Sequence, residues 1–202
     1  MTGLRQLQRQ RVHDAISAAA VSLFLERGFD EVPVTEIAAA AGVSKPTLFK
    51  YFPAKEDLVL HRIADHEGEA ARMVRQRAAG EEPLEALRRH FLDGLARRDP
   101  VTGLNDHPEV VAFHRMVFAT PSLAARLFQH ISRDELALAE ALGEVMDDLT
   151  AALLAAQVLA AQRVLARRNW LPLAEGRPLR EVEPEAVRAA ERAFSLLAIR
   201  TG

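Results

Sequence analysis

Three lysines lie in the short segment SKPTLFKYFPAK, residues 44–55, which contains no acidic residue. Ammonium groups at this density attract phosphate, and the hydroxyl groups of Ser44, Thr47 and Tyr51 can donate hydrogen bonds to phosphate oxygens. The whole chain of 202 residues carries a formal net charge of -2, so it is not a polycation. A nucleic acid partner would therefore have to meet this local patch.

The residues around this patch predict two short helices joined by a tight turn. A helix over residues 33–41 and a second one beginning near Pro46 flank Gly42, which permits a left-handed backbone. Ile37 before the turn and Leu48 after it supply the apolar contacts that two steeply crossing helices need. This pattern is typical of a helix-turn-helix, whose second helix lies in the major groove of DNA.

The stretch GFDEVPVTEIAAAAGVSKPTLFKYFPAKEDLV, residues 28–59, resembles the DNA-binding domain of the TetR family of bacterial transcriptional regulators. The GVS turn, the YFPAKE junction and the preceding helix carry the resemblance. Phe49 stands where the family commonly has tyrosine, and Pro33 where a capping threonine is common, so two phosphate contacts are in doubt. The resemblance implies DNA contacts at Thr35, Ser44, Lys45, Pro46, Thr47, Phe49, Lys50, Tyr51 and Lys55.

Within this set the residues divide by expected role. We expect Lys55, at the start of the following helix, to face the phosphate backbone beside the major groove. Thr47 and Lys50, on the second helix of the motif, are expected to influence which operator sequence is preferred.

The composition predicts an all-α fold, because alanine and leucine dominate and no alternating stretch of strand length stands out. About nine helices are expected. They form an amino-terminal three-helix helix-turn-helix domain, residues 1–56, and a larger helical effector-binding and dimerisation domain, residues 57–202. One continuous helix is expected from about residue 55 to 78, and the last two helices over residues 149–168 and 184–199.

The last two predicted helices are rich in alanine, whose small side chain lets helices approach closely. The TetR resemblance implies a homodimer held by these helices, and two recognition helices that read paired half-sites require such symmetry. Packing within one chain is the alternative. The residues expected at the dimer interface are Leu153, Ala156, Ala160, Ala189, Ala190, Phe194 and Leu197.

A ligand pocket in the larger domain would need apolar walls and a few polar groups. The candidates are Phe91, Leu95, Val111, His114, Phe118, Leu127, Ile131 and Gln157, and for each of them ordinary core packing is the alternative. Residues 99–142 resemble the carboxy-terminal domain of actinobacterial TetR regulators, including mycofactocin-associated ones. That resemblance implies an acyl-CoA-like effector.

Other classes of protein find little support. The chain has no cysteine, no HExxH motif, no glycine-rich phosphate loop and no GxSxG elbow, so neither an enzyme, a metal site nor a cofactor is expected. His61, Asp65 and His66 fall on nearby helical positions, but we expect solvated surface residues there rather than metal ligands. No signal peptide and no uncharged run of membrane-spanning length appear, which predicts a cytoplasmic protein without a membrane partner.

The sequence therefore predicts a sequence-specific transcriptional regulator that binds a double-stranded DNA operator. The TetR resemblance implies a homodimeric repressor, released from DNA by a small apolar or amphipathic ligand. Two alternatives stay open: a constitutive DNA-binding protein without an effector, and a helical ligand-binding module without a DNA function. The clustered lysines argue against the second alternative.

Overall fold

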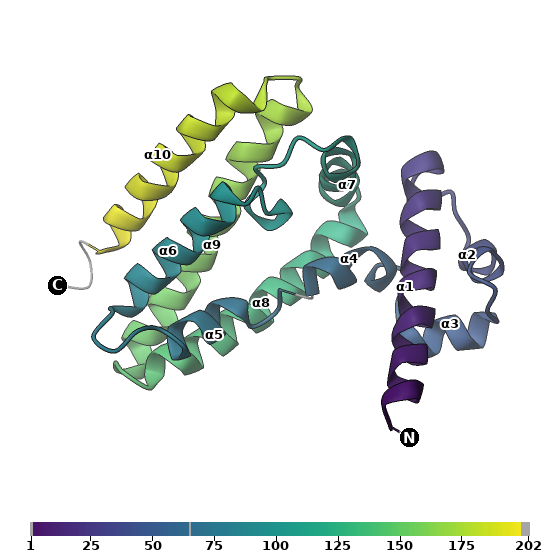
Figure 1. Ribbon diagram of the computed structural model, residues 1–202, viewed down its shortest axis with the longest axis horizontal. Coiled ribbons are helices and arrows are strands. Elements are labelled where there is room, and N and C mark those ends of the chain that lie inside the picture. The colour runs from purple at the N-terminus through teal and green to yellow at the C-terminus, as the bar shows by residue number, and fades with distance from the viewer. Residues whose placement is uncertain (1, 65, 199–202) are drawn as a thin grey trace. The chain divides into compact units, whose positions relative to one another are not determined.

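The computed structural model describes residues 2–64 and 66–198, and every regular element within these ranges is helical (Figure 1). The all-α prediction is confirmed. The described residues form ten α-helices and one short 3-10 helix, η1. The chain divides into two compact units, which we call the first unit (Met1–Asp65 with Arg115–Leu127) and the second unit (His66–His114 with Phe128–Gly202).

Four helices build most of the first unit: α1 (Thr2–Arg27), α2 (Val34–Ala40), α3 (Lys45–Tyr51) and α4 (Asp57–Ala64). Helix α1 packs against both α2 and α4, and α2 packs against α3. The apolar residues that face inward from these helices and their connections include Ile16, Phe24, Ile37, Leu48, Phe52 and Leu58. The apolar residues spaced as predicted for a helix-turn-helix thus form a buried core beneath α3.

The prediction of one continuous helix from residue 55 to 78 is wrong, because the helical structure is interrupted between α4 and α5 (Glu69–Arg75). Gly68 immediately precedes α5 with φ of 72°, a left-handed conformation that suits glycine. Its backbone N–H donates to Asp134 Oδ1 at 2.7 Å. The residue that fixes this turn therefore comes from a distant part of the sequence.

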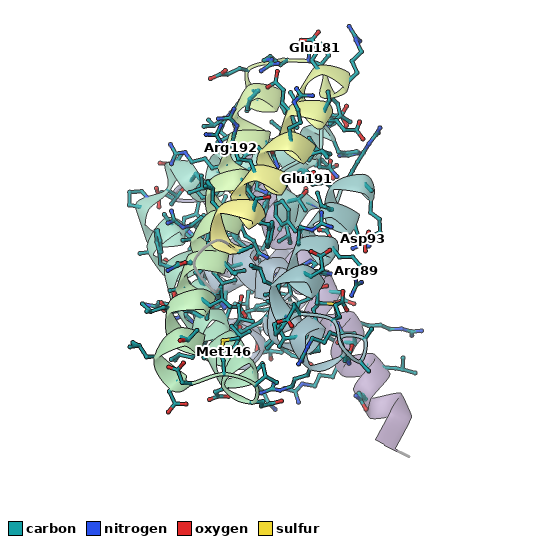
Figure 2. All side chains as sticks on the ribbon, turned by 90° about the vertical axis from the view of Figure 1, so that its left-hand side faces the viewer. Arg89, Asp93, Met146, Glu181, Glu191 and Arg192 are labelled. Carbon is teal, nitrogen blue, oxygen red and sulfur yellow. The ribbon has the colours of Figure 1, made fainter. Side chains whose placement is uncertain are left out.

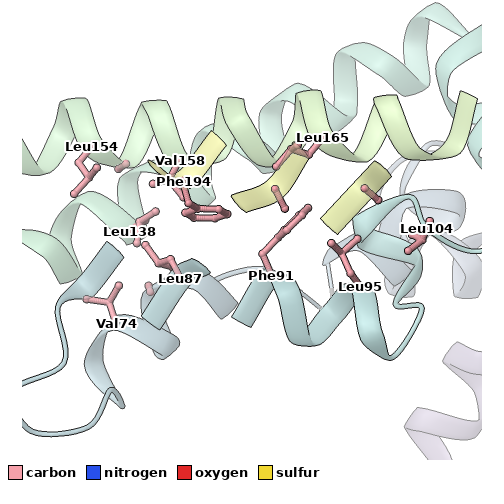
Figure 3. Close-up of a cluster of buried hydrophobic side chains, with 14 of the residues drawn as sticks. Val74, Leu87, Phe91, Leu95, Leu104, Leu138, Leu154, Val158, Leu165 and Phe194 are labelled. Atoms are coloured by element: carbon pink, nitrogen blue, oxygen red, sulfur yellow. The ribbon is translucent and has the colours of Figure 1, made fainter. Parts of the chain in front are cut away.

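The second unit is built around α6 (Pro83–Ala96), α9 (Asp148–Ala174) and α10 (Leu179–Ala198). Helix α10 packs against both α6 and α9, and η1 (Pro100–Thr102) packs against α6 and α9. Figure 3 shows the resulting core, in which side chains of α6, α9 and α10 meet. Helices α7 (Pro108–Ala119) and α8 (Pro121–Gly143) each contribute residues to both units.

Four residues with predicted functional roles are buried in this core, and Figure 3 labels three of them, Phe91, Leu95 and Phe194. Phe91 and Leu95, expected as pocket walls, are 6% and 1% exposed, and the Phe91 ring lies 6.1 Å from that of Phe194. Phe194 and Ala190, expected at the dimer interface, are 1% and 0% exposed. Side chains buried this completely within one chain have no surface left for a partner subunit.

Helices α9 and α10 are longer than expected, since α9 continues past Pro172 and α10 begins before Pro184. By length and composition alone α9 resembles a membrane-spanning helix. However, Leu154, Val158 and Leu165 of α9 pack into the core of the second unit. That is the behaviour of a core helix in a globular domain.

Candidate nucleic-acid interface

Local sequence chemistry starts α3 at a defined residue. The Ser44 hydroxyl accepts a hydrogen bond from the Thr47 backbone N–H at 3.2 Å and lies 2.8 Å from the Thr47 hydroxyl. Pro46 fits the first turn, where its missing N–H would have no helical partner. Leu48 is fully buried and anchors the opposite side. The cap and the anchor together fix which face of α3 meets solvent.

The solvent-facing side of α2 and α3 carries most of the predicted contact residues. Thr35, Ser44, Lys45, Pro46, Phe49 and Lys50 are exposed, and Thr47 and Tyr51 are half-buried. The Lys45 ammonium lies 6.0 Å from the centre of the Phe49 ring. Within the described residues neither Lys45 nor Lys50 forms an ion pair, so both cations are available to an external anion.

The prediction that the Lys55 side chain faces DNA phosphate needs correction. Its ammonium donates to the backbone carbonyl of Phe29 at 2.6 Å. The same ammonium lies 4.6 Å from the centre of the Phe29 ring and 5.5 Å from that of Phe24. These contacts hold the α3–α4 junction against the end of α1, which is a structural role.

His61 is also placed differently from its expected surface position. It is half-buried, and its Nε2 lies 2.8 Å from the Ser17 hydroxyl of α1. His13 stacks on Phe52 with ring centres 4.5 Å apart, and His61 meets the edge of this pair. This cluster packs α1 and α4 around the end of α3.

The other two residues of that histidine prediction are Asp65 and His66. Asp65 lies outside the described residues, while His66 Nδ1 lies 2.7 Å from Glu69 Oε2. Among the residues that the structure describes, no cluster of three histidine or acidic side chains is arranged to hold a metal ion.

The predicted pocket residues outside the core are divided between the units. Val111, His114, Ile131 and Gln157 are half-buried residues of the second unit, while Phe118 and Leu127 belong to the segment that joins the first unit. Burial lowers the pKa of His114 to about 4, which keeps its imidazole neutral near neutral pH. Its ring centre lies 6.0 Å from that of Trp170. Trp170, the sole tryptophan of the chain, was not among the predicted pocket residues.

The remaining predicted interface residues lie on α9 and α10. On α9 the outward side presents Leu153 and Ala160, with Ala156 half-buried between them. Leu149 and Val164, which were not predicted, extend this apolar side and are 69% and 58% exposed. On α10, Ala189 and Leu197 are half-buried against the core.

The outward side of α10, unlike that of α9, carries several charged side chains. Figure 2 shows Glu181, Glu191 and Arg192 along α10, and Arg89 and Asp93 on α6. Arg88 of α6 lies within 3.5 Å of Glu191, so charged side chains link these two helices at the surface. Of the two helices, α9 therefore presents the more apolar outward side.

Known proteins are similar to this chain in sequence and in fold. The family model "Bacterial regulatory proteins, tetR family" matches residues 16–61, which include α2 and α3. The transcriptional regulator TcmR of Streptomyces glaucescens is 31% identical over 175 residues, covering 84% of this chain and 77% of that protein.

Solved structures of other regulators have a similar fold. A TetR-family regulator from Streptomyces coelicolor has a TM-score of 0.54 at 25% identity, covering 92% of this chain and 96% of that one. FadR from Bacillus subtilis, in complex with stearoyl-CoA, has a TM-score of 0.55 at 16% identity, covering 91% and 96%. The chain belongs to the TetR family of bacterial regulatory proteins, and it is a DNA-binding transcriptional regulator rather than an enzyme.

Proposed function

We propose that the protein is a homodimeric repressor that leaves its operator when a small apolar or amphipathic molecule binds to it. In this proposal residues 1–56 recognise DNA, and residues 57–202 bind the effector and form the dimer. The observation that carries the DNA part is the surface of α3, a capped helix with Leu48 buried beneath it. Lys45 and Lys50 face out from it, and neither forms an ion pair with a residue that the structure describes. The protein would act in the cytoplasm, where bacterial operators lie.

The side chains of the exposed surface divide into two roles. Lys45 lies at the amino end of α3 and Lys50 in its last turn. We place both at the phosphates that border the major groove, which for Lys50 replaces the role in operator preference expected from the sequence. Phe49 offers an apolar edge to a thymine methyl group, and Thr47 offers a hydroxyl group to a base edge. Thr35 on α2, Ser44, Pro46 and Tyr51 complete the contact surface.

The dimer part of the proposal is supported by the outward side of α9. Leu149, Leu153, Ala156, Ala160 and Val164 recur at intervals of three or four residues, which places them on one face of the helix. An exposed apolar stripe of this length is costly in water and typical of an interface. A second copy of the same chain is the partner that gives two α3 helices two-fold symmetry.

The effector part is supported by His114 of the second unit, the last residue of α7 before this helix continues into the first unit. Its neutral imidazole beside Trp170 suits an apolar or amphipathic molecule better than an anion. Helix α7 continues from His114 into the first unit, so a ligand that displaces this part of α7 also acts on the DNA-binding unit. Because FadR binds stearoyl-CoA, acyl-CoA compounds belong among the effectors tested first.

The experiment is a selection of bound fragments from the DNA of the source bacterium, followed by fluorescence anisotropy with the selected fragment. The protein is expected to bind few fragments tightly at about 0.15 M salt. At least one compound from a panel of acyl-CoA and aromatic compounds should release it from the DNA. Equal, weak binding to every fragment would contradict a repressor. Selective binding that no compound changes would favour the alternative of a constitutive DNA-binding protein.

A further inference from the structure

Helix α1 extends well beyond the core that it helps to build. Its first fully buried side chain among the described ones is Ile16, whereas residues 6–11 are all exposed. These six residues include Arg9 and Arg11 but no acidic residue. A helical segment that buries nothing in its own chain and carries only positive charge is suited to an anionic partner.

Arg9 is held beside the recognition helix. Its guanidinium carbon lies 6.0 Å from the centre of the Tyr51 ring, at the end of α3. A guanidinium over an aromatic face is attracted by the ring and keeps its N–H groups free to donate. Tyr51 therefore acts as a platform that orients Arg9 toward the partner of α3.

The same residues surround a hollow. Gln8 and Arg9 of α1, with Lys50 and Tyr51 of α3, line a space of about 290 Å³. All four side chains carry hydrogen-bond donors, and two of them are cations. Within the described part of the chain, Arg9 and Lys50 have no carboxylate partner. The hollow thus offers convergent donors and positive charge with no acidic group to balance them.

We propose that this hollow binds a phosphate of the operator backbone, outside the base pairs read by α3. Arg9 donates its N–H groups to the phosphate oxygens, Lys50 adds a second charge, and Tyr51 and Gln8 donate hydrogen bonds. The site rests on the proposed operator binding and deepens it. It adds Gln8 and Arg9 of α1 to the contact residues predicted on α2, α3 and the start of α4.

The test compares Arg9→Ala with Arg11→Ala in the full-length protein. Arg11 lies two residues further along α1, so its side chain leaves the opposite side of the helix. Both variants lose one exposed charge from the same segment, and circular dichroism should show unchanged folding. The probe is the fragment selected by the wild-type protein, measured by anisotropy over a range of salt concentrations.

Arg9→Ala is expected to weaken binding about tenfold and to lower the salt slope by about 0.9 per protomer. Arg11→Ala should change the slope by less than half as much. Ethylation of phosphates on the probe should identify a position that interferes with wild-type binding but not with Arg9→Ala binding. Equal effects of the two substitutions, or an unchanged interference pattern, would overturn the proposed site.

A double-mutant cycle tests the platform itself. Tyr51→Ala is expected to reduce affinity, and most of the Arg9→Ala effect should disappear in its background, since the guanidinium is no longer held in place. Independent, additive effects would contradict the arrangement. If the wild-type protein selects no fragment, operator binding itself fails. If it does select one and Arg9→Ala behaves like Arg11→Ala, only the phosphate site fails.

Discussion

The guanidinium of Arg126, in α8, donates to both carboxylate oxygens of Asp57, in the first turn of α4. The distances are 2.9 Å from Nε to Oδ1 and 3.2 Å from Nη2 to Oδ2. Asp57 Oδ2 also accepts the Ala54 backbone N–H at 3.1 Å. Because α8 continues from this unit into the second one, the pair fastens a helix shared by both units to the start of α4.

Replacing Arg126 with methionine should lower the free energy of unfolding by about 1–3 kcal/mol, because Asp57 loses a charged partner at a partly buried site. DNA binding should persist, while release by the effector should require a higher effector concentration. Denaturant unfolding and effector titration of the DNA complex measure the two effects. Arg133→Met, at an exposed position further along α8, is the control and should change neither.

Lys50 and Lys55 should behave differently although they are five residues apart in one basic segment. Lys55→Met should lower the free energy of unfolding by about 1–2 kcal/mol, since the Phe29 carbonyl loses its donor, and should leave the salt slope of DNA binding unchanged. Lys50→Met should leave stability unchanged and lower the slope by about 0.9 per protomer. The reverse pattern would restore Lys55 as the phosphate contact.

His114 should make the stability of the second unit depend on pH. Its folded pKa of about 4 lies below the ordinary value of 6.5, so the unfolded chain binds the proton first as the pH falls. This contribution to stability is present above about pH 6.5 and is lost as the pH falls toward about 4. From about pH 7 to about pH 5 the loss should be about 2 kcal/mol.

The contribution can be isolated by comparing the wild-type protein with His114→Leu in denaturant unfolding at each pH. The difference between their free energies of unfolding should change by this amount over the interval. Parallel pH profiles for the two proteins would show that the imidazole is solvated rather than buried.

Gly103, which follows η1, lies where the chain meets α9. Its φ is 74°, and a Cβ atom there would lie 2.1 Å from the carbonyl oxygen of Ala166. Gly103→Ala should therefore cost about 3–5 kcal/mol of stability. Gly176 has a similar φ of 88° but open space around it, so Gly176→Ala should cost only about 1–2 kcal/mol. Thermal or denaturant unfolding of both variants separates the steric clash with Ala166 from the backbone strain. Equal losses of stability in the two variants would exclude the close contact at Gly103.

If α9 forms the dimer interface, a charge placed within it should halve the mass of the particle in solution. Leu153→Glu places a charge in the centre of the apolar stripe on α9 and should convert the dimer to a monomer at micromolar concentration. Leu136→Glu, at an exposed leucine of α8, is the matched control and should remain dimeric. Analytical ultracentrifugation distinguishes these results. A dimer that survives Leu153→Glu would place the interface on another surface.

The sequence predicted those parts of the molecule that depend on neighbouring residues. Ile37, Gly42 and Leu48 lie within a dozen residues of one another, so their spacing was enough to predict the helix-turn-helix. Pro46 likewise indicated the start of α3 locally, whereas the Ser44 cap became visible only in the structure. The exposed face of α3 follows from those same few positions.

Features that depend on distant partners were not predictable in this way. The break at Gly68 involves the carboxylate of Asp134, and Lys55 is held by a carbonyl 26 residues before it. Phe194 belongs to an apolar pattern that suits either an interface or a core, and only its packing against α6 distinguishes the two. Periodicity identifies the apolar side of a helix but not the element that covers it.

The most direct test of the account is a hydroxyl-radical footprint of the full-length protein on its selected DNA fragment. A dimer that reads its operator through two α3 helices should protect two regions related by two-fold symmetry, with centres one helical turn of DNA or a multiple apart. Lys50→Met should weaken protection in both regions equally. A single unsymmetrical region, or uniform weak protection along the fragment, would contradict a dimeric regulator that reads its operator through α3.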